Sequence, residues 1–359
     1  MRFWIFSLGL ALALFIFIAR RKSGGPSRSI PLLLGAMALV FYTALRVVFP
    51  LLPMAAPTGP AQVVEERIFY RHPTAFPAMA TEGPYREIPL RVYRPRELEP
   101  GAHPALIFSH GSFGVASSNE TLFHELASRG YLVFSLDHPH HSFFSRGSSG
   151  KLTLVDGAFF REVVASRGGE DPRRTLEELS RWLGPRVEDL NFILDELLDG
   201  AGDQPLEEMV DPEGIVLAGH SLGGSAALAL GRERPEDILA LVILEAPFAG
   251  DIVGIRGEEF LFVEEEYPRP ILHIYSDALW GRMDEITTYG QNVRLLSAQS
   301  PKFSNLHLEG VGHLGLTDFS RTSPLLTHLL DGGLDEKSPR EALGELNEGV
   351  LEFLEELEE

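Results

Sequence analysis

A serine between two glycines is the residue with the clearest potential chemistry in this sequence. Segment 219–223 reads Gly-His-Ser-Leu-Gly, follows the apolar run 215–218 and precedes a stretch of small residues. This pattern is typical of a strained strand-to-helix turn that lifts a serine hydroxyl clear of a sheet, where the glycines leave room for the turn. The helix that follows stabilises negative charge developing at its N-terminus. The spacing therefore predicts that Ser221 is a nucleophile.

A base must remove the proton of that hydroxyl, and a third group must orient the base. In proteins with this turn the chain order is serine, acid, histidine. Four histidines follow Ser221 at a useful distance: His273, His307, His313 and His328. The first two fall in predicted strands and the last in a predicted helix, whereas His313 lies in a glycine-rich loop after the last predicted strand. We therefore expect His313 to be the base.

Two carboxylates compete for the orienting role. Glu245 ends the predicted strand 241–244, and Asp277 closely follows the predicted strand 271–275. Either position can present an acid to His313 at the edge of a parallel sheet, so both assignments stay open at this point.

Backbone amides are expected to bind the oxyanion of a tetrahedral intermediate. One is the amide of Leu222, directly after the nucleophile. The second should come from the loop that follows the strand 105–109, and within its sequence His-Gly-Ser-Phe-Gly we choose the amide of Ser112.

Segment 137–141 reads Asp-His-Pro-His-His, and three histidines in four residues resemble part of a zinc site. No matching Asp or His follows at ligand spacing, so we interpret the segment as a structural or site-lining loop. The chain has no cysteine, which excludes thiolate metal sites and disulfides. We expect no metal and no cofactor.

The elements that must position these residues form an α/β pattern. Short apolar runs alternate with helical segments from about residue 86, which indicates a largely parallel sheet with crossover helices. Predicted strands cover 105–109, 131–136, 215–218, 241–244 and 271–275. A helix is predicted over 175–199 with a kink or break at Gly184-Pro185, and 139–170 should be irregular. The formal net charge of −20 argues against a nucleic-acid partner.

The first 57 residues differ from the rest in charge and hydropathy. Residues 3–19 are uncharged and apolar, a second apolar stretch covers 30–57 with Arg46 as its one charge, and no acidic residue precedes Glu65. The alternative of a cleaved signal peptide is disfavoured, because the first run ends in Ala-Arg-Arg-Lys without a small-residue cleavage site. We expect a membrane anchor of two helices over 1–57 and a catalytic domain over 58–359.

Basic residues between the two apolar runs indicate on which side of the membrane the large domain lies. Arg20, Arg21, Lys22 and Arg28 lie in the intervening loop. Under the positive-inside rule this loop is cytoplasmic, which places the large domain outside the cytoplasm. If only the first run spans the membrane, the same charges place that domain inside.

These residues resemble the α/β-hydrolase superfamily, and within it the platelet-activating-factor acetylhydrolase (lipoprotein-associated phospholipase A2) group and related bacterial esterases. The matching segments are Phe-Ser-His-Gly-Ser at 108–112, Asp-His-Pro at 137–139, Gly-His-Ser-Leu-Gly-Gly at 219–224, Leu-Glu-Ala-Pro-Phe at 244–248 and Gly-Val-Gly-His at 310–313. The resemblance implies an α/β-hydrolase fold and hydrolysis of esters with short or oxidised acyl chains, without metal or cofactor. In that group the triad acid stands where this chain has Glu245, with Asp in place of Glu.

The expected function is therefore that of a membrane-anchored serine hydrolase acting on carboxylic esters of lipids or short acyl chains. An acyltransferase or a serine peptidase would use the same triad, and a non-catalytic membrane scaffold would require that a triad member be missing. The sequence leaves the acyl length, the head group and the oligomeric state open.

Overall fold

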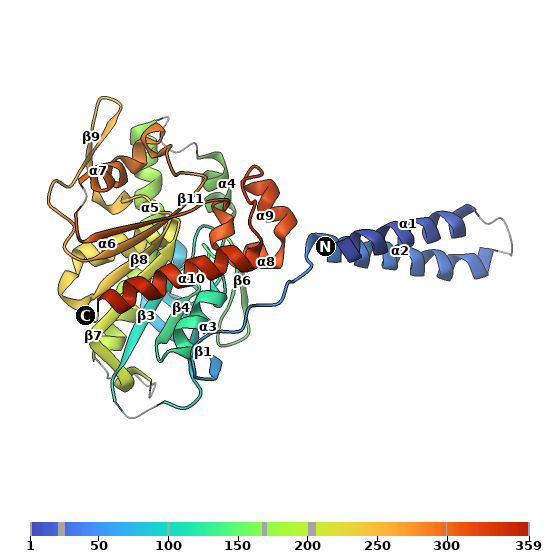
Figure 1. The fold of residues 1–359 in the computed structure, drawn as a ribbon, viewed down its shortest axis with the longest axis horizontal. Helices are drawn as coiled ribbons and strands as arrows, with labels where there is room; N and C mark the ends of the chain where they lie inside the picture. The colour runs from blue at the N-terminus through green and yellow to red at the C-terminus, as the bar shows by residue number, and fades with distance from the viewer. Residues whose placement is uncertain are drawn as a thin grey trace.

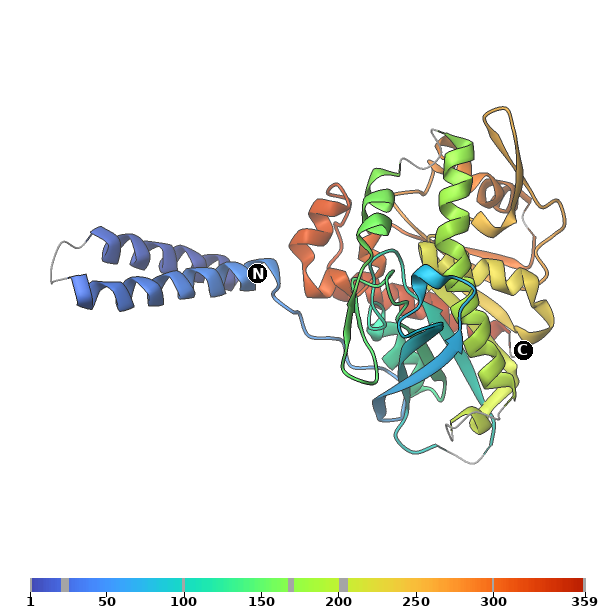
Figure 2. The ribbon, with the colours of Figure 1, turned by 180° about the vertical axis from the view of Figure 1, so that it is seen from behind.

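The computed structural model describes residues 2–20, 26–98, 101–166, 171–199, 206–298 and 300–357. A helical hairpin stands apart from a larger α/β body (Figure 1). The hairpin consists of α1 (Arg2–Arg20) and α2 (Pro26–Val48), which lie side by side in both ribbon views (Figures 1 and 2). Bulky apolar side chains such as Phe6, Leu10 and Phe41 are exposed along it.

The body is built on an eight-stranded sheet in the order β1-β2-β4-β3-β7-β8-β11-β12. The pairs β1–β2 and β2–β4 are antiparallel and all later neighbours are parallel. Its strands are β1 (Val63–Pro73), β2 (Tyr85–Pro95), β3 (His103–Ser109), β4 (Leu132–Leu136), β7 (Val210–His220), β8 (Ala240–Leu244), β11 (Ile271–Ser276) and β12 (Phe303–Leu308). The predicted, mostly parallel α/β sheet is confirmed.

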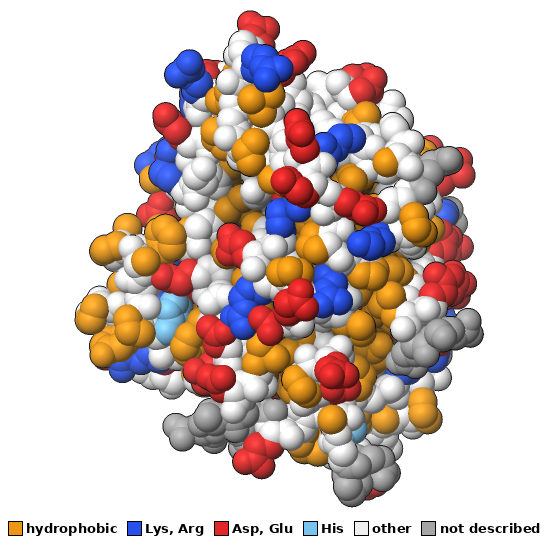
Figure 3. All heavy atoms as spheres, turned by 90° about the vertical axis from the view of Figure 1, so that its left-hand side faces the viewer, with side chains coloured by type: hydrophobic (Ala, Val, Ile, Leu, Met, Phe, Trp, Pro, Cys, Tyr) orange, Lys and Arg blue, Asp and Glu red, His pale blue; other side chains and the backbone are white. Residues whose placement is uncertain are grey.

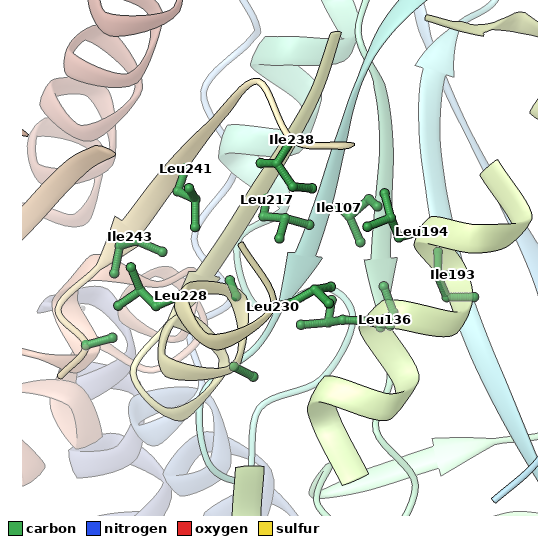
Figure 4. Packing of buried hydrophobic residues seen from close by; sticks show 14 of the residues in the cluster. Ile107, Leu136, Ile193, Leu194, Leu217, Leu228, Leu230, Ile238, Leu241 and Ile243 are labelled. Carbon is green, nitrogen blue, oxygen red and sulfur yellow. The ribbon is translucent and has the colours of Figure 1, made fainter. Parts of the chain in front are cut away.

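Helices cover both faces of the sheet because successive side chains of a buried strand point to opposite faces. Ile107 and Leu217 belong to the cluster that packs under α5 (Pro172–Asp199) and α6 (Leu222–Glu233) (Figure 4). Leu106 and Val216, one residue earlier on each strand, belong to the cluster under α3 (Glu120–Ser128) and α10 (Pro339–Glu356). The continuous apolar runs in the sequence are therefore strands buried on both sides.

The remaining elements lie around the edges of the sheet. Two small antiparallel pairs are β5 (Phe144–Arg146) with β6 (Leu152–Leu154), and β9 (Ile252–Arg256) with β10 (Glu259–Phe262). The other α-helices are α4 (Gly157–Ala165), α7 (Gly290–Ala298), α8 (Phe319–Thr322) and α9 (Pro324–Leu330). Short 3₁₀ turns are η1 (Pro77–Met79), η2 (Glu207–Met209), η3 (Pro235–Asp237), η4 (Ala249–Asp251), η5 (Met283–Glu285), η6 (Thr287–Tyr289) and η7 (Leu314–Leu316).

The structure differs from two local predictions. Helix α5 continues through Gly184-Pro185, so the helix does not break there, and the glycine leaves room for the ring of Phe76: a Cβ at Gly184 would lie 2.6 Å from Phe76 Cζ. The segment 139–170, expected to be irregular, contains β5, β6 and α4, and its residues 167–170 lie outside the described part of the chain. Tertiary packing outweighs the local signals in both cases.

The connection between hairpin and body is held by hydrogen bonds. The Ser323 hydroxyl donates to Val48 O over 2.5 Å, and Leu52 N donates to Arg321 O over 2.9 Å. Further along, Thr58 N donates to Glu125 Oε2 over 2.9 Å. The linker between α2 and β1 (residues 49–62), which contains four prolines, is thus bound to the surface of the body.

Candidate active site

Ser221 occupies the sharp turn between β7 and α6. Its φ of 51° and ψ of −124° lie outside the regions that a serine ordinarily adopts, and its amide donates to Leu244 O on the neighbouring strand over 2.9 Å. A Cβ at Gly223 would lie 2.0 Å from Ser109 O, so only glycine allows α6 to start this close to β3. The glycines of the sequence motif therefore have a steric cause, which for Gly223 is the close approach of β3.

His313 forms a hydrogen bond with Glu245 at the carboxyl edge of the sheet. The distance from His313 Nδ1 to Glu245 Oε1 is 2.7 Å, which leaves Nε2 as the ring nitrogen that can act as a base. Burial by itself lowers the pKa of His313, but the hydrogen bond and the charge of Glu245 outweigh this effect, so the pKa is raised above 6.5. The side chain of His313 remains 31% exposed, so a substrate can reach it.

Glu245 is fully buried and rigidly held. It directly follows β8 with a φ of 46°, its amide donates to Ile274 O over 2.8 Å, and its Oε2 accepts a hydrogen bond from Ser276 N over 2.5 Å. A carboxylate fixed on both oxygens can hold an imidazole in one orientation.

The competing acid Asp277 is engaged elsewhere. Asp277 Oδ1 lies 2.7 Å from His307 Nε2, and Oδ2 accepts a hydrogen bond from Gly310 N over 2.8 Å. The structure thus brings Glu245, and not Asp277, to His313, while His307 pairs with the second acid.

The loop after β3 runs against Ser221. A Cβ at Gly111 would lie 3.3 Å from Ser221 Cβ, so this backbone passes directly beside the nucleophile candidate before reaching Ser112. Leu222 is the first residue of α6, where the amides have no acceptor within the helix. Both amides expected to bind an oxyanion therefore belong to backbone segments that adjoin Ser221.

Two supporting residues were missed by the sequence analysis. His220 stacks near His313, with ring centroids 4.5 Å apart, and its Nε2 lies 3.1 Å from His313 O. Burial, followed by the His313 charge, lowers the pKa of His220 well below 6.5, so it is neutral. Asp331 accepts hydrogen bonds from Leu314 N and Gly315 N and so braces the loop that carries His313. His220 could have been identified from the sequence, because it directly precedes Ser221 in the Gly-His-Ser-Leu-Gly motif.

The histidine-rich segment 137–141 forms part of a buried polar cluster. His138 Nδ1 donates to Asp189 Oδ2 over 2.8 Å, and His138 Nε2 accepts from the Ser109 hydroxyl over 2.8 Å. Arg86 donates to both Asp189 oxygens over 2.7 and 2.8 Å. Burial, together with the charge of Arg186, lowers the pKa of His138 to about 4. This histidine therefore stays neutral and acts as a structural link.

Arg186 connects this cluster to the loop after β3. It is fully buried, and it donates to His110 O over 2.5 Å and to Gly111 O over 3.2 Å. His110 Nε2 in turn accepts from the Ser142 hydroxyl over 2.8 Å. The guanidinium thus fixes the two carbonyl groups that precede Ser112, and nothing in the local sequence signals this.

One group of ligand-type side chains lies in the same region: His72, Glu188 and Asp189. Asp189 is already bound by Arg86, and Glu188 accepts hydrogen bonds from Thr74 Oγ1 and Ala75 N over 2.5 and 2.6 Å. Both carboxylates already accept hydrogen bonds from the protein. The three residues therefore fit a structural role better than a metal site.

Comparison with known proteins shows the family and the fold of the chain. The model of the alpha/beta hydrolase family matches residues 106–349, more than half of the chain. Lipase LipV of Mycobacterium tuberculosis (strain ATCC 25618 / H37Rv) is 38% identical over 78 residues, which cover 21% of this chain and 26% of that lipase, so the match spans about a quarter of the relative. A ferulic acid esterase from Streptomyces cinnamoneus shares the fold with a TM-score of 0.61 at 20% identity, over 84% of this chain and 92% of that one. The chain therefore belongs to the alpha/beta hydrolase family.

Proposed function

We propose that this protein hydrolyses carboxylic esters through Ser221, His313 and Glu245. The observation that carries the proposal is the His313–Glu245 hydrogen bond of 2.7 Å, formed by a histidine that also contacts His220, the residue before Ser221 in the strained turn. Glu245 orients the imidazole and stabilises its charged form, and His313 Nε2 removes the proton of the Ser221 hydroxyl. The serine oxygen then bonds to the ester carbonyl carbon.

The negative charge of the resulting tetrahedral intermediate moves to the former carbonyl oxygen. The amides of Ser112 and Leu222 are the donors that would bind it, and the dipole of α6 adds to their effect. Proton transfer from His313 to the leaving alcohol completes acylation. Water, activated by the same histidine, then attacks the acyl-enzyme, and the acid is released as Ser221 recovers its proton.

We further propose that the hairpin anchors the enzyme in a membrane. Within the described residues, Ile30–Val48 is long and apolar enough to cross a bilayer, and Trp4–Ala19 forms a shorter apolar helix. Nineteen residues at 1.5 Å per residue extend about 28 Å, close to the thickness of a hydrocarbon core. With basic residues between the two helices, the catalytic domain would lie outside the cytoplasm.

A covalent label tests the nucleophile. A fluorophosphonate probe is expected to label the wild type and to leave Ser221→Ala unlabelled, because only the activated hydroxyl reacts. The matched control is Ser225→Ala, one helical turn further along α6, where the hydroxyl donates to Pro247 O over 2.7 Å; this variant should still be labelled. Equal labelling of wild type and Ser221→Ala would refute the mechanism. Release of free acid from an ester by the wild type separates hydrolysis from acyl transfer.

A further inference from the structure

Bulky apolar side chains are exposed on both sides of the candidate active site. Six of them, here called the apolar rim, are between 40% and 67% exposed: Phe143, Phe144, Leu154, Phe160, Leu329 and Leu330. Side chains of this size are normally buried, and a group of them at one place marks a surface that binds something apolar.

One half of the rim adjoins the loop expected to bind the oxyanion. Phe143 N donates to Gly114 O over 3.2 Å, and the ring of Phe160 lies 4.9 Å from that of Phe113, next to Ser112. Phe144 and Leu154 are directly opposed on β5 and β6, and therefore share one face of that hairpin.

The other half adjoins the loop of His313. Leu329 and Leu330 end α9, and the next residue, Asp331, accepts hydrogen bonds from Leu314 N and Gly315 N. The rim thus flanks the catalytic groups from the oxyanion side and from the histidine side.

The rim also lies beside the exit of the hairpin from the membrane. Ser323, the N-cap of α9, donates to Val48 O at the end of α2. Helix α9 has seven residues and is about 10 Å long, so Leu329 and Leu330 lie within about that distance of Ser323, which contacts the end of α2. In both ribbon views α4, the β5–β6 pair and α9 occupy the side of the body that faces the hairpin (Figures 1 and 2).

Residues at the end of the hairpin mark the level of the membrane surface. The rings of Trp4 and Tyr42 meet edge to face with centroids 6.0 Å apart, and the Arg46 guanidinium lies 4.9 Å from the Trp4 ring. Trp, Tyr and Arg of this kind are enriched at the boundary between hydrocarbon and water. The face of the body opposite the hairpin carries many acidic and basic side chains among its hydrophobic ones (Figure 3).

We propose that the apolar rim enters the headgroup region of the bilayer that holds the hairpin, so that the active site takes lipid esters directly from the membrane. The proposal rests on the ester hydrolysis and the anchoring proposed above. Apolar side chains that insert 5–10 Å into this region add to the binding of a membrane protein, in keeping with the short reach of α9. The hydrogen-bonded linker keeps the rim on the membrane side.

Paired substrates test whether the rim serves catalysis. Full-length protein in phosphatidylcholine vesicles would be assayed with a fluorogenic long-chain phospholipid and with water-soluble p-nitrophenyl butyrate. For Leu154→Glu and Leu330→Glu we expect about a tenfold or larger loss on the phospholipid and little change on the soluble ester, since a charge opposes insertion. The matched control Val253→Glu, on β9 and equally exposed at 67%, should match the wild type on both. Rim variants that cleave the phospholipid at the wild-type rate would overturn the proposal.

A label tests the position of the rim independently of the substrate. Because the chain has no cysteine, Leu330→Cys and Val253→Cys each accept one environment-sensitive fluorophore. We expect the label at position 330 to shift to the blue in vesicles and to be quenched by nitroxide lipids, while the label at 253 does neither. A shift without lipid quenching would assign the rim to a protein partner and contradict the proposal. If the wild type cleaves neither ester, ester hydrolysis fails as a function, and the labels still decide whether the rim meets the bilayer.

Discussion

Two histidine–carboxylate pairs in this protein have almost the same hydrogen-bond distance, but the pKa of the histidine shifts in opposite directions. His313 Nδ1 lies 2.7 Å from Glu245, and His138 Nδ1 lies 2.8 Å from Asp189. The pKa of His313 is raised, because the bond and charge of Glu245 outweigh the effect of burial. The pKa of His138 falls to about 4, because full burial and the charge of Arg186 outweigh its carboxylate.

The difference shows that the distance to a carboxylate does not by itself make a histidine a base. Glu245 has no arginine partner among the described ion pairs, so its charge acts on His313. Asp189 is shared with Arg86, and the full burial of His138 leaves no route for a substrate. The His313–Glu245 pair is therefore the one that a substrate can reach, whereas the His138–Asp189 pair links β3 to α5 inside the protein.

The largest expected effect is the loss of turnover when the acid that orients His313 is replaced. It distinguishes Glu245 from Asp277. Glu245→Gln should lower kcat by about 10⁴, since an imidazole without its orienting carboxylate loses its tautomer and its charge stabilisation. The matched control is Asp277→Asn, which breaks the pair with His307 and should leave kcat within about tenfold of the wild type. Near-UV circular dichroism would check that both variants fold. A larger loss in Asp277→Asn would move the acid to that residue.

Replacing the carboxylate of the buried His138–Asp189 pair should lower the free energy of unfolding. Asp189→Asn leaves Arg86 and His138 without their carboxylate, and removing one partner of a buried ion pair costs about 3–5 kcal/mol. Urea unfolding of the full chain in detergent measures this loss. As a control, Glu66→Gln removes the partly exposed pair with Arg94 and should cost at most about 1 kcal/mol. Equal stability of the two variants would show that the cluster does not hold the fold.

Lowering the pH should affect His138 and His313 differently. His138 stays neutral in the folded protein down to about pH 4, whereas in the unfolded chain it takes up a proton near pH 6.5. The unfolded state thus binds more protons between these values, so stability falls as pH falls, by about 2 kcal/mol from pH 6.5 to pH 5 for this residue. Urea unfolding at several pH values measures the slope, and His138→Gln should reduce it. A slope unchanged in that variant would contradict the low pKa.

The pKa of His313 can be measured from the pH dependence of the esterase activity. The base must be neutral in the free enzyme, so kcat/KM should rise with pH through an acid limb that lies above pH 6.5. Asp331 contributes to the raised pKa, and Asp331→Asn should therefore move this limb to lower pH. A limb well below pH 6.5 in the wild type would mean that Glu245 does not outweigh burial.

Much of the architecture and most candidate site residues were readable in the sequence, because each strand and turn leaves a pattern in its own segment of the chain. Gly219 meets Gly223 within the turn and Gly223 meets Ser109 of β3, while the apolar runs mark strands covered on both faces. The sequence did not show that α5 continues through Gly184-Pro185, because the Phe76 ring that packs beside Gly184 comes from a distant segment.

Only the tertiary structure decides which carboxylate meets His313 and which residue holds the loop after β3. Glu245 and Asp277 both follow strands of one parallel sheet, so their local sequences are equivalent. The parallel register of β11 and β12 pairs Tyr275 with His307, which brings His307 to Asp277 and leaves Glu245 for His313. Arg186 reaches Gly111 across 75 positions of the chain, and local sequence cannot encode a contact that exists only when distant helices and strands pack together.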